Sequence, residues 1–184
     1  MIPTIIGIAI LLLIVIVLVM SYNSFVRLLM TVEEAFSNMD IELKKRFDLI
    51  PNLVETVKGY MGHEQETLTR LVNLRSVDYT KMTDQEKIEN SSEIARVIPK
   101  IMAVAENYPD LKASTNFLKL SDQLTQIEED IANARKYYNG AVKQYNIKIR
   151  TVPSNLVAVL FRFEKKPLYE LEDDNERQNV KVEF

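Results

Sequence analysis

The chain has 184 residues, a formal net charge of −3, only 4 glycines and 6 prolines, and no cysteine. So few turn-forming residues argue against a turn-rich β fold and favour long helices. The lack of cysteine excludes a disulfide framework, a cysteine nucleophile, a thiolate zinc site and a lipid-modified cysteine; the lack of a basic excess argues against nucleic acid as a partner.

An apolar stretch opens the chain. Every residue from Ile5 to Met20 is apolar or glycine, and about 20 helical residues span the roughly 30 Å hydrocarbon core of a bilayer. We therefore expect residues 2–20 to cross the lipid bilayer as a helix. A cleaved signal peptide is the alternative, but neither the basic segment before the apolar run nor the small-residue cleavage site after it is present.

Basic residues occur only after this stretch. Arg27 follows it closely, and Lys44, Lys45 and Arg46 come later. Because cytoplasmic loops are enriched in Lys and Arg, we expect a single-pass protein of the cell membrane. Its N-terminus should lie outside and its soluble domain in the cytoplasm.

A seven-residue apolar repeat follows the predicted span. One seam contains Leu29, Phe36, Leu43, Ile50 and Val57, and a second contains Val32, Met39, Leu53 and Tyr60, interrupted by Arg46. Such a repeat is typical of a helix packed against a partner helix. It predicts one unbroken helix from the membrane to about Arg75.

Pro51 lies inside this predicted helix. Proline removes a backbone donor and clashes with the carbonyl of Phe47, four residues earlier. Because the seam keeps its phase on both sides, we expect a kink and not a helix end. Either the kink only curves the helix around its neighbours, or it frees a carbonyl for a polar contact or acts as a hinge.

Two more long helices are predicted. Thr83 and Glu86 have the spacing of a capping box, so the second helix should begin there, be kinked or split at Pro99, and stop at "AENYPDLKAS". In an up–down–up arrangement, this helix descends beside the first and ends near Asn52 to Lys58. The third helix has a seam of Phe117, Leu124, Ile131, Tyr138 and Tyr145 and should end near Arg150.

The C-terminal part is less regular. Ser154 could cap a short amphipathic helix ending near Phe163, and the remaining residues should form a charged, exposed tail pinned by Leu168, Tyr169 and Leu171. The expected organisation is an anchor over 1–23, a helical bundle over 24–163 and a tail over 164–184. The expected fold is all-α: a transmembrane helix followed by an elongated antiparallel bundle of three long helices and a short C-terminal helix.

Four segments carry a resemblance to a known family: "DIELKKRFDLIPNLVETVKGYMGHE", "AENYPDLKASTNF", "EEDIANARKYYNGAVKQYN" and "VPSNLVAVLFRFEKKPLYELED". They are similar to the LemA family of bacterial membrane proteins, over nearly the whole chain. The family's closing motif usually has an aromatic residue where Val152 stands and a glycine where Arg162 stands. The resemblance implies a single-pass helical bundle without an established catalytic activity, links to membrane or envelope stress, and a membrane metalloprotease as a candidate partner.

Residues with catalytic or metal-binding chemistry are sparse. His63 is the only histidine and lacks the second histidine of a zinc-protease helix. The acidic runs 128–130 and 172–174 place neighbouring carboxylates on different helix faces, and no serine lies in a nucleophile elbow. We therefore expect a protein that is not an enzyme and has no cofactor and no metal.

Polar residues on or beside the seams are the candidate interaction sites. Arg46 either extends its head to solvent or forms an ion pair between helices that fixes their register. Asn139 and Asn146, seven residues apart, either form hydrogen bonds across helices or face water. A third candidate is a polar cluster at the kink, formed by Asp48, Pro51, Asn52 and Glu55 with Asn107, Pro109, Asp110 and Lys112; the alternative is a solvated helix face.

Two functions fit these features. The first is a non-enzymatic interaction or scaffold module at the membrane, most simply a homo-oligomer. The second is a signal-input module in which movement at Pro51 passes along the first helix to a separate effector.

Overall fold

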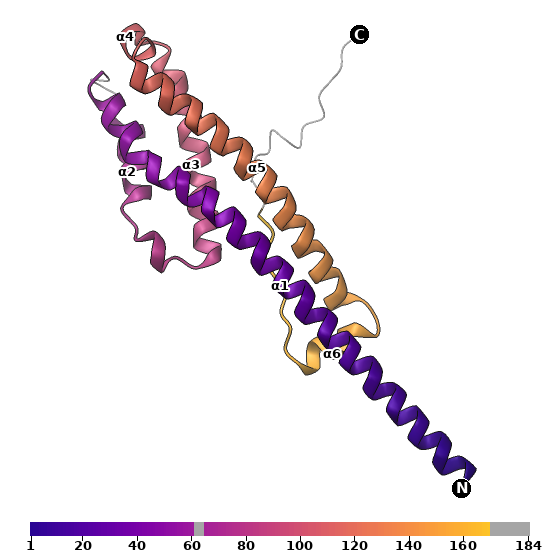
Figure 1. The fold of residues 1–184 in the computed structure, drawn as a ribbon. Coiled ribbons are helices and arrows are strands. Elements are labelled where there is room, and N and C mark those ends of the chain that lie inside the picture. The colour runs from indigo at the N-terminus through magenta and orange to yellow at the C-terminus, as the bar shows by residue number, and fades with distance from the viewer. Residues whose placement is uncertain (61–64, 170–184) are drawn as a thin grey trace, which may run out of the picture.

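The computed structural model describes residues 1–60 and 65–169, and every regular element in those two ranges is helical. In chain order they are α1 (Ile2–Lys58), α2 (Gln65–Arg75), the 3-10 helix η1 (Tyr79–Lys81), α3 (Asp84–Ala105), α4 (Pro109–Lys112), α5 (Thr115–Arg150) and α6 (Ser154–Leu160). Figure 1 shows an elongated bundle built on α1 and α5. The expected all-α fold is confirmed.

Helices α1 and α5 form an antiparallel pair. The ring centroids of Phe25 and Tyr145 lie 6.3 Å apart and those of Phe36 and Tyr138 lie 5.6 Å apart, so residue numbers fall along α5 as they rise along α1. The buried seam residues are Phe36, Leu43, Ile50 and Val57 in the first seam of α1, Val32, Met39 and Leu53 in its second seam, and Phe117, Leu124, Ile131, Tyr138 and Tyr145 in α5. The seven-residue repeats therefore mark the true contact surfaces.

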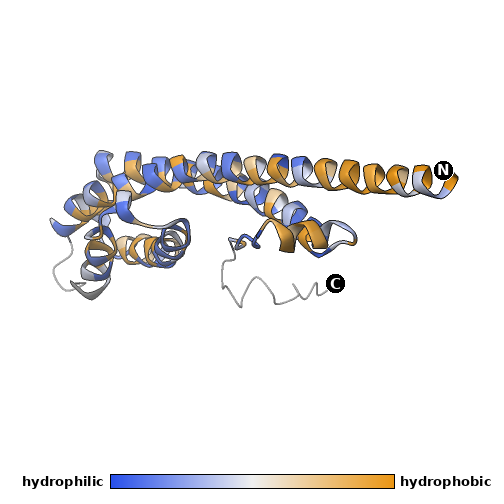
Figure 2. Cartoon of the chain, turned by 90° about the horizontal axis from the view of Figure 1, so that it is seen from below, coloured by the Kyte–Doolittle hydropathy of each residue, from blue (hydrophilic) through white to orange (hydrophobic). Residues whose placement is uncertain are grey.

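The first part of α1 extends beyond the bundle. An 18-residue stretch near the N-terminus has a mean hydropathy of 3.2, and none of it is buried. Figure 2 shows this end of α1 as a nearly uniform apolar rod, in contrast to the mixed colouring of the bundle. By length and composition it is able to cross a membrane, and it continues without a break into the bundle.

The prediction of an unbroken helix to about Arg75 is wrong. Helix α1 passes through Pro51 as expected but ends at Lys58, and α2 folds back beside it (Figure 1). The antiparallel pairing explains the end point, because α5 begins at Thr115, opposite the last turns of α1. A longer α1 would leave the apolar side chains of Leu68 and Leu71 without a partner, whereas the reversal buries both.

The predicted direction of the second long helix is also wrong. Asp40 of α1 pairs with Lys87 of α3, and Arg46 pairs with Ser91, so residue numbers rise together and α3 runs parallel to α1. The turn after Lys58 reverses α2, and the loop around η1 reverses the chain again. The end of α3 still lies at the distal end of the bundle, where Figure 1 places α4.

The helix ends follow local chemistry. Thr83 and Glu86 form the predicted capping box with both reciprocal hydrogen bonds, and α3 continues through Pro99 without a split. Ser154 does not cap α6: it is the first helical residue, and its hydroxyl donates to the carbonyls of Lys148 and Thr151 at 2.7 and 2.8 Å. The Lys148 carbonyl also accepts from the Thr151 amide at 3.4 Å and the Thr151 carbonyl from the Asn155 amide at 2.8 Å, so the serine adds to the hydrogen bonds where α5 ends and α6 begins.

Residues after α6 turn back along α5. Arg162 has a φ of 57°, the left-handed region that a glycine adopts without steric cost, which accounts for the glycine that the family motif has at this position. The following residues up to Tyr169 have no helical structure, and Tyr169 is only 2% exposed. Tyr169 therefore holds this part of the tail on the bundle as predicted, whereas Leu168, also expected to hold it, is 42% exposed. Leu171 and the other residues after Tyr169 lie outside the described residues.

Candidate functional site

A buried arginine joins three helices at the middle of the bundle. The side chain of Arg46 is 1% exposed, and its Nη1 donates to Glu128 Oε1 of α5 at 2.6 Å. Its Nη2 donates to the Ser91 carbonyl of α3 at 2.6 Å and to the Ser91 hydroxyl. The structure thus has the interhelical ion pair, and a buried charge held in this way ties α1, α3 and α5 to one relative position.

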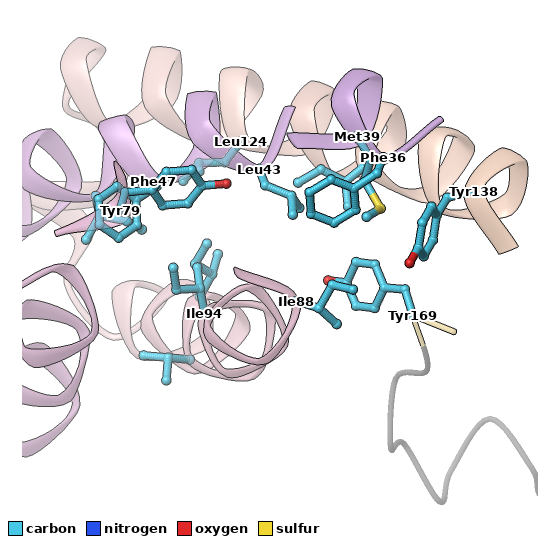
Figure 3. Close-up of a cluster of buried hydrophobic side chains, with 14 of the residues drawn as sticks. Phe36, Met39, Leu43, Phe47, Tyr79, Ile88, Ile94, Leu124, Tyr138 and Tyr169 are labelled. Carbon is cyan, nitrogen blue, oxygen red and sulfur yellow. The ribbon is translucent and has the colours of Figure 1, made fainter. Parts of the chain in front are cut away.

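The network continues to the C-terminal segment, by which we mean residues 163–169. The hydroxyls of Ser91 and Tyr169 lie 2.8 Å apart, so the chain of contacts runs from Glu128 through Arg46 and Ser91 to Tyr169. Figure 3 shows the Tyr169 ring beside Ile88, on the α3 side of the core. Four segments that are distant in sequence therefore meet at one polar network inside the apolar core.

Two asparagines of α5 hold the backbone of the C-terminal segment. Asn139 donates from Nδ2 to the Tyr169 carbonyl at 2.9 Å and accepts from the Tyr169 amide at 2.8 Å. Asn146 does the same with Lys166, at 2.9 and 3.0 Å. The predicted hydrogen-bonding role across helices had the wrong partner, because both side chains bind an extended segment and not another helix.

The spacing of these bonds has a simple geometric cause. Seven helical residues separate Asn139 from Asn146, a rise of about 10.5 Å. Three extended residues separate Lys166 from Tyr169, and they span about 10 Å. The two repeats match, so the two asparagines of α5 bind the backbone of two residues that lie three apart in an extended chain, and Arg135 of α5 lies 5.8 Å from the centroid of the Tyr169 ring. Tyr138 adds a hydrogen bond from its hydroxyl to the Pro167 carbonyl at 2.9 Å.

A second polar group fastens η1 and α3 to α1. Tyr79 donates its hydroxyl to Asp40 Oδ1 at 2.6 Å, and Lys87 donates to Asp40 Oδ2 at 2.7 Å. Burial, and then the hydrogen bond to Asp40, raise the pKa of Tyr79 well above its usual value. Burial also raises the pKa of Tyr138 to about 12. Both tyrosines are therefore neutral hydrogen-bond donors at physiological pH.

The predicted polar cluster at the kink does not form. Asp48 pairs with Lys44 on its own helix, and Asn52 and Glu55 line a shallow hollow with Asn116 and Lys119. Among the described residues, no side-chain hydrogen bond involves any of the four residues expected on the other side, Asn107, Pro109, Asp110 and Lys112, and all four are exposed. Because α1 ends at Lys58 and α2 folds back beside it, the face of α1 with Asn52 and Glu55 does not meet residues 107–112.

Sequence reasoning missed several members of the network. Ser91, Glu128 and Tyr169 were not singled out as partners of Arg46, and the cluster at Asp40 was not foreseen. Within residues 1–60 and 65–169, no three acidic or histidine side chains gather as metal ligands; His63 lies outside these ranges. The arrangement supplies ion pairs and hydrogen bonds that position chain segments.

The fold and the polar network are those of a helical-bundle protein. Its first helix begins with a sequence of the type that spans membranes. The chain belongs to the LemA family, which it matches over residues 35–184. It is 29% identical over 131 residues to Protein LemA of Metamycoplasma hominis, covering 69% of this chain and 58% of that protein.

Two further relatives are magnetosome proteins. The chain is 23% identical over 179 residues to Magnetosome protein MamQ 2 of Paramagnetospirillum magneticum, covering 83% of this chain and 66% of that protein. It is 21% identical over 174 residues to Magnetosome protein MamQ of Magnetospirillum gryphiswaldense, covering 80% and 64%. The chain thus spans about six-tenths of the length of these curated relatives.

Proposed function

We propose that this chain is a non-enzymatic, single-pass membrane protein whose bundle binds other proteins at the bilayer and holds them in a stable assembly. The observation that carries the proposal is the continuity of α1, which supplies both the apolar stretch and one side of the bundle core. A continuous helix fixes the height and direction of the bundle above the membrane. The family resemblance suggests a role in membrane or envelope stress.

The binding surface in this proposal is the groove between α2, η1 and α3. Its volume is about 540 Å³, and it is lined by apolar Leu74, Val77 and Met82 and by acidic Asp78, Glu86, Glu89 and Glu93, together with Lys81 and Asn90. Hydrogen bonds from Thr83 hold the pKa of Glu86 below its usual value, and the hydrogen bond from Arg70 does the same for Glu93. Asp78 pairs with Lys81 and Glu93 pairs with Arg70 and Arg96, so the net negative charge of the groove comes mainly from Glu86 and Glu89.

The distance of this groove from the membrane limits which proteins can reach it. η1 is fastened to Asp40, which lies 20 residues after Met20, or about 30 Å along α1. A groove lined by both apolar and acidic side chains favours a partner segment with an apolar side chain between Lys or Arg residues. We propose membrane proteins that project such a segment, a membrane metalloprotease among them, and a second copy of this chain as assembly partners.

Affinity purification of the full chain from native membranes tests this proposal. We expect a membrane protein to co-purify at a fixed ratio with the parent chain and to be lost with Val77→Glu. Leu118→Glu is the matched control, because Val77 and Leu118 are 50% and 49% exposed and Leu118 lies on α5, outside the groove. Equal recovery with both variants would contradict the groove, and recovery of this chain alone as a monomer would contradict the scaffold function.

A signal-input module is the second candidate, and the Arg46 network favours it. Tyr169 touches Ser91, which touches Arg46 on the helix that enters the membrane. Release of the C-terminal segment would therefore alter the surroundings of a buried charge in α1. A scaffold keeps the same stoichiometry before and after envelope stress, whereas a signal-input module changes it, so the purification repeated under stress separates the two.

We propose that the N-terminus lies outside and the bundle in the cytoplasm. Ile41 is 52% exposed on α1, and the chain has no native cysteine. An Ile41→Cys variant should resist a membrane-impermeant thiol reagent in intact cells and react after permeabilisation. Labelling of intact cells would reverse the orientation.

A further inference from the structure

Helix α6 is apolar on two opposite faces. Val157 and Ala158 are each 2% exposed and pack on the bundle. On the other side, Leu156, Val159 and Leu160 are 68%, 80% and 65% exposed. With 100° between successive helical residues, these three lie on one face, opposite the buried pair. Val152 and Phe161, just outside the helix, add to the exposed patch.

This patch lies where α1 leaves the bundle. The ring of Tyr22 is 4.8 Å from that of Phe161, and the ring of Phe25 stacks on Phe163 at 4.8 Å. Tyr22 is two residues after the end of the apolar stretch at Met20, at the level where tyrosines gather at a membrane interface. Figure 1 places α6 beside this part of α1, and Figure 2 shows its apolar colour next to the apolar end of α1.

The charge around the patch is mostly positive, and Glu33 and Glu164 are the first acidic residues beyond it along the chain. Residues 1–32 and 131–163 contain no Asp or Glu; their basic residues are Arg27, Arg135, Lys136, Lys143, Lys148, Arg150 and Arg162. Because α5 runs antiparallel to α1, the second range descends toward the apolar stretch (Figure 1). Arg27, Arg150 and Arg162 are exposed near α6.

We propose that α6 inserts its exposed face into the headgroup–acyl boundary of an anionic bilayer, beside the membrane-spanning part of α1. Arg27, Arg150 and Arg162 bind the lipid phosphates around it. The inference rests on the membrane anchoring in the proposed function. A lipid surface fits better than a protein partner because the patch continues the apolar surface of α1 and the charged residues near it are mainly cations, as in interfacial helices.

Depth-dependent fluorescence quenching tests the insertion. The cysteine-free full chain allows single variants Val159→Cys, Val77→Cys and Ile14→Cys, each labelled with an environment-sensitive fluorophore. The labelled chains are reconstituted in vesicles of phosphatidylcholine with phosphatidylglycerol. We expect lipids with a nitroxide just below the headgroup to quench the label at Val159 several-fold more than the label at Val77. The label at Ile14 should be quenched by nitroxides deeper in the acyl chain.

Labels at the three positions distinguish the ways in which the proposal could be wrong. Quenching at Ile14 with none at Val159 would overturn the insertion of α6 and leave the anchor intact. No quenching at either position would overturn the membrane anchoring itself. A label at Val159 with blue-shifted emission but no lipid quenching would mean that protein covers the patch, which also overturns the proposal.

The binding of lipid phosphates by the arginines has its own test. Arg150→Gln together with Arg162→Gln should lower the quenching at Val159 in phosphatidylglycerol vesicles to the level seen in pure phosphatidylcholine. The matched control, Lys100→Gln with Lys119→Gln, changes two exposed cations at the other end of the bundle and should have no effect. Equal behaviour of the two double variants would overturn phosphate binding by these arginines.

Discussion

The α1–α5 pair and the C-terminal segment are held in different ways. The pair is joined by apolar side chains at seven-residue intervals, and most of them are buried. The segment is held at one end by Phe163, which stacks on Phe25, and beyond it by side chains that bind its backbone and by one buried tyrosine that reaches the Arg46 network. Apolar contacts supply most of the free energy of folding but tolerate small shifts. Hydrogen bonds to particular backbone atoms fix the register of the segment along α5.

The largest expected effect comes from removing an apolar contact between α1 and α5. Phe36 is 8% exposed and packs against Tyr138 of α5, so Phe36→Ala should lower the free energy of unfolding by about 4 kcal/mol. Denaturant unfolding in detergent, followed by helical circular dichroism, measures it. Ile41→Ala, on an exposed position of the same helix, should change it little. A small loss at Phe36 would mean that the seam is not the main source of stability.

Charge reversal at the centre of the network comes next. Arg46→Glu places a carboxylate beside Glu128 and should cost about 3 kcal/mol of unfolding free energy, because the buried charge is left uncompensated. Arg46→Met should be mild, since methionine fills the space without a charge and Glu128 is 38% exposed to water. Equal tolerance of both changes in the same unfolding assay would show that Arg46 does not fix the helices.

Loss of one asparagine should release the segment without unfolding the bundle. Asn139→Ala removes two hydrogen bonds to Tyr169, at about 1 kcal/mol each, so closing of the segment should weaken by about 2 kcal/mol. Limited proteolysis should then cut within residues 163–169 faster, with unchanged helical content. Asn133→Ala, an exposed asparagine on the same helix, is the control, and equal cleavage of both variants would refute the role of Asn139.

The smallest effect should come from one hydroxyl. Tyr169→Phe keeps the buried ring and removes the hydrogen bond to Ser91, at about 1 kcal/mol. The same proteolysis assay should show a modest increase in cleavage, with Tyr137→Phe at a 53% exposed position as the control. An increase as large as that of Asn139→Ala would mean that the hydroxyl, and not the backbone bonds, controls the segment.

The two kinds of contact also differ in how well the sequence predicts them. The seams of α1 and α5 and the capping box at Thr83 follow from local spacing, so they could be found without a structure. The reversal after Lys58 could not, because the apolar period continues through Val57 and the reason for the turn is the start of α5 far along the chain. The seven-residue spacing of Asn139 and Asn146 can be seen in the sequence. Their partner, the C-terminal segment, has no repeating pattern, so only the structure shows what these asparagines bind.

Residue-resolved hydrogen exchange of backbone amides tests the central claim most directly. The amides of Lys166 and Tyr169 donate to Asn146 and Asn139, while those of Lys165 and Leu168 have no acceptor among the described residues. The structure therefore predicts slow exchange at Lys166 and Tyr169 and fast exchange at Lys165 and Leu168, with protection at Tyr169 lost in Asn139→Ala. Uniformly fast exchange across these four amides would contradict the account.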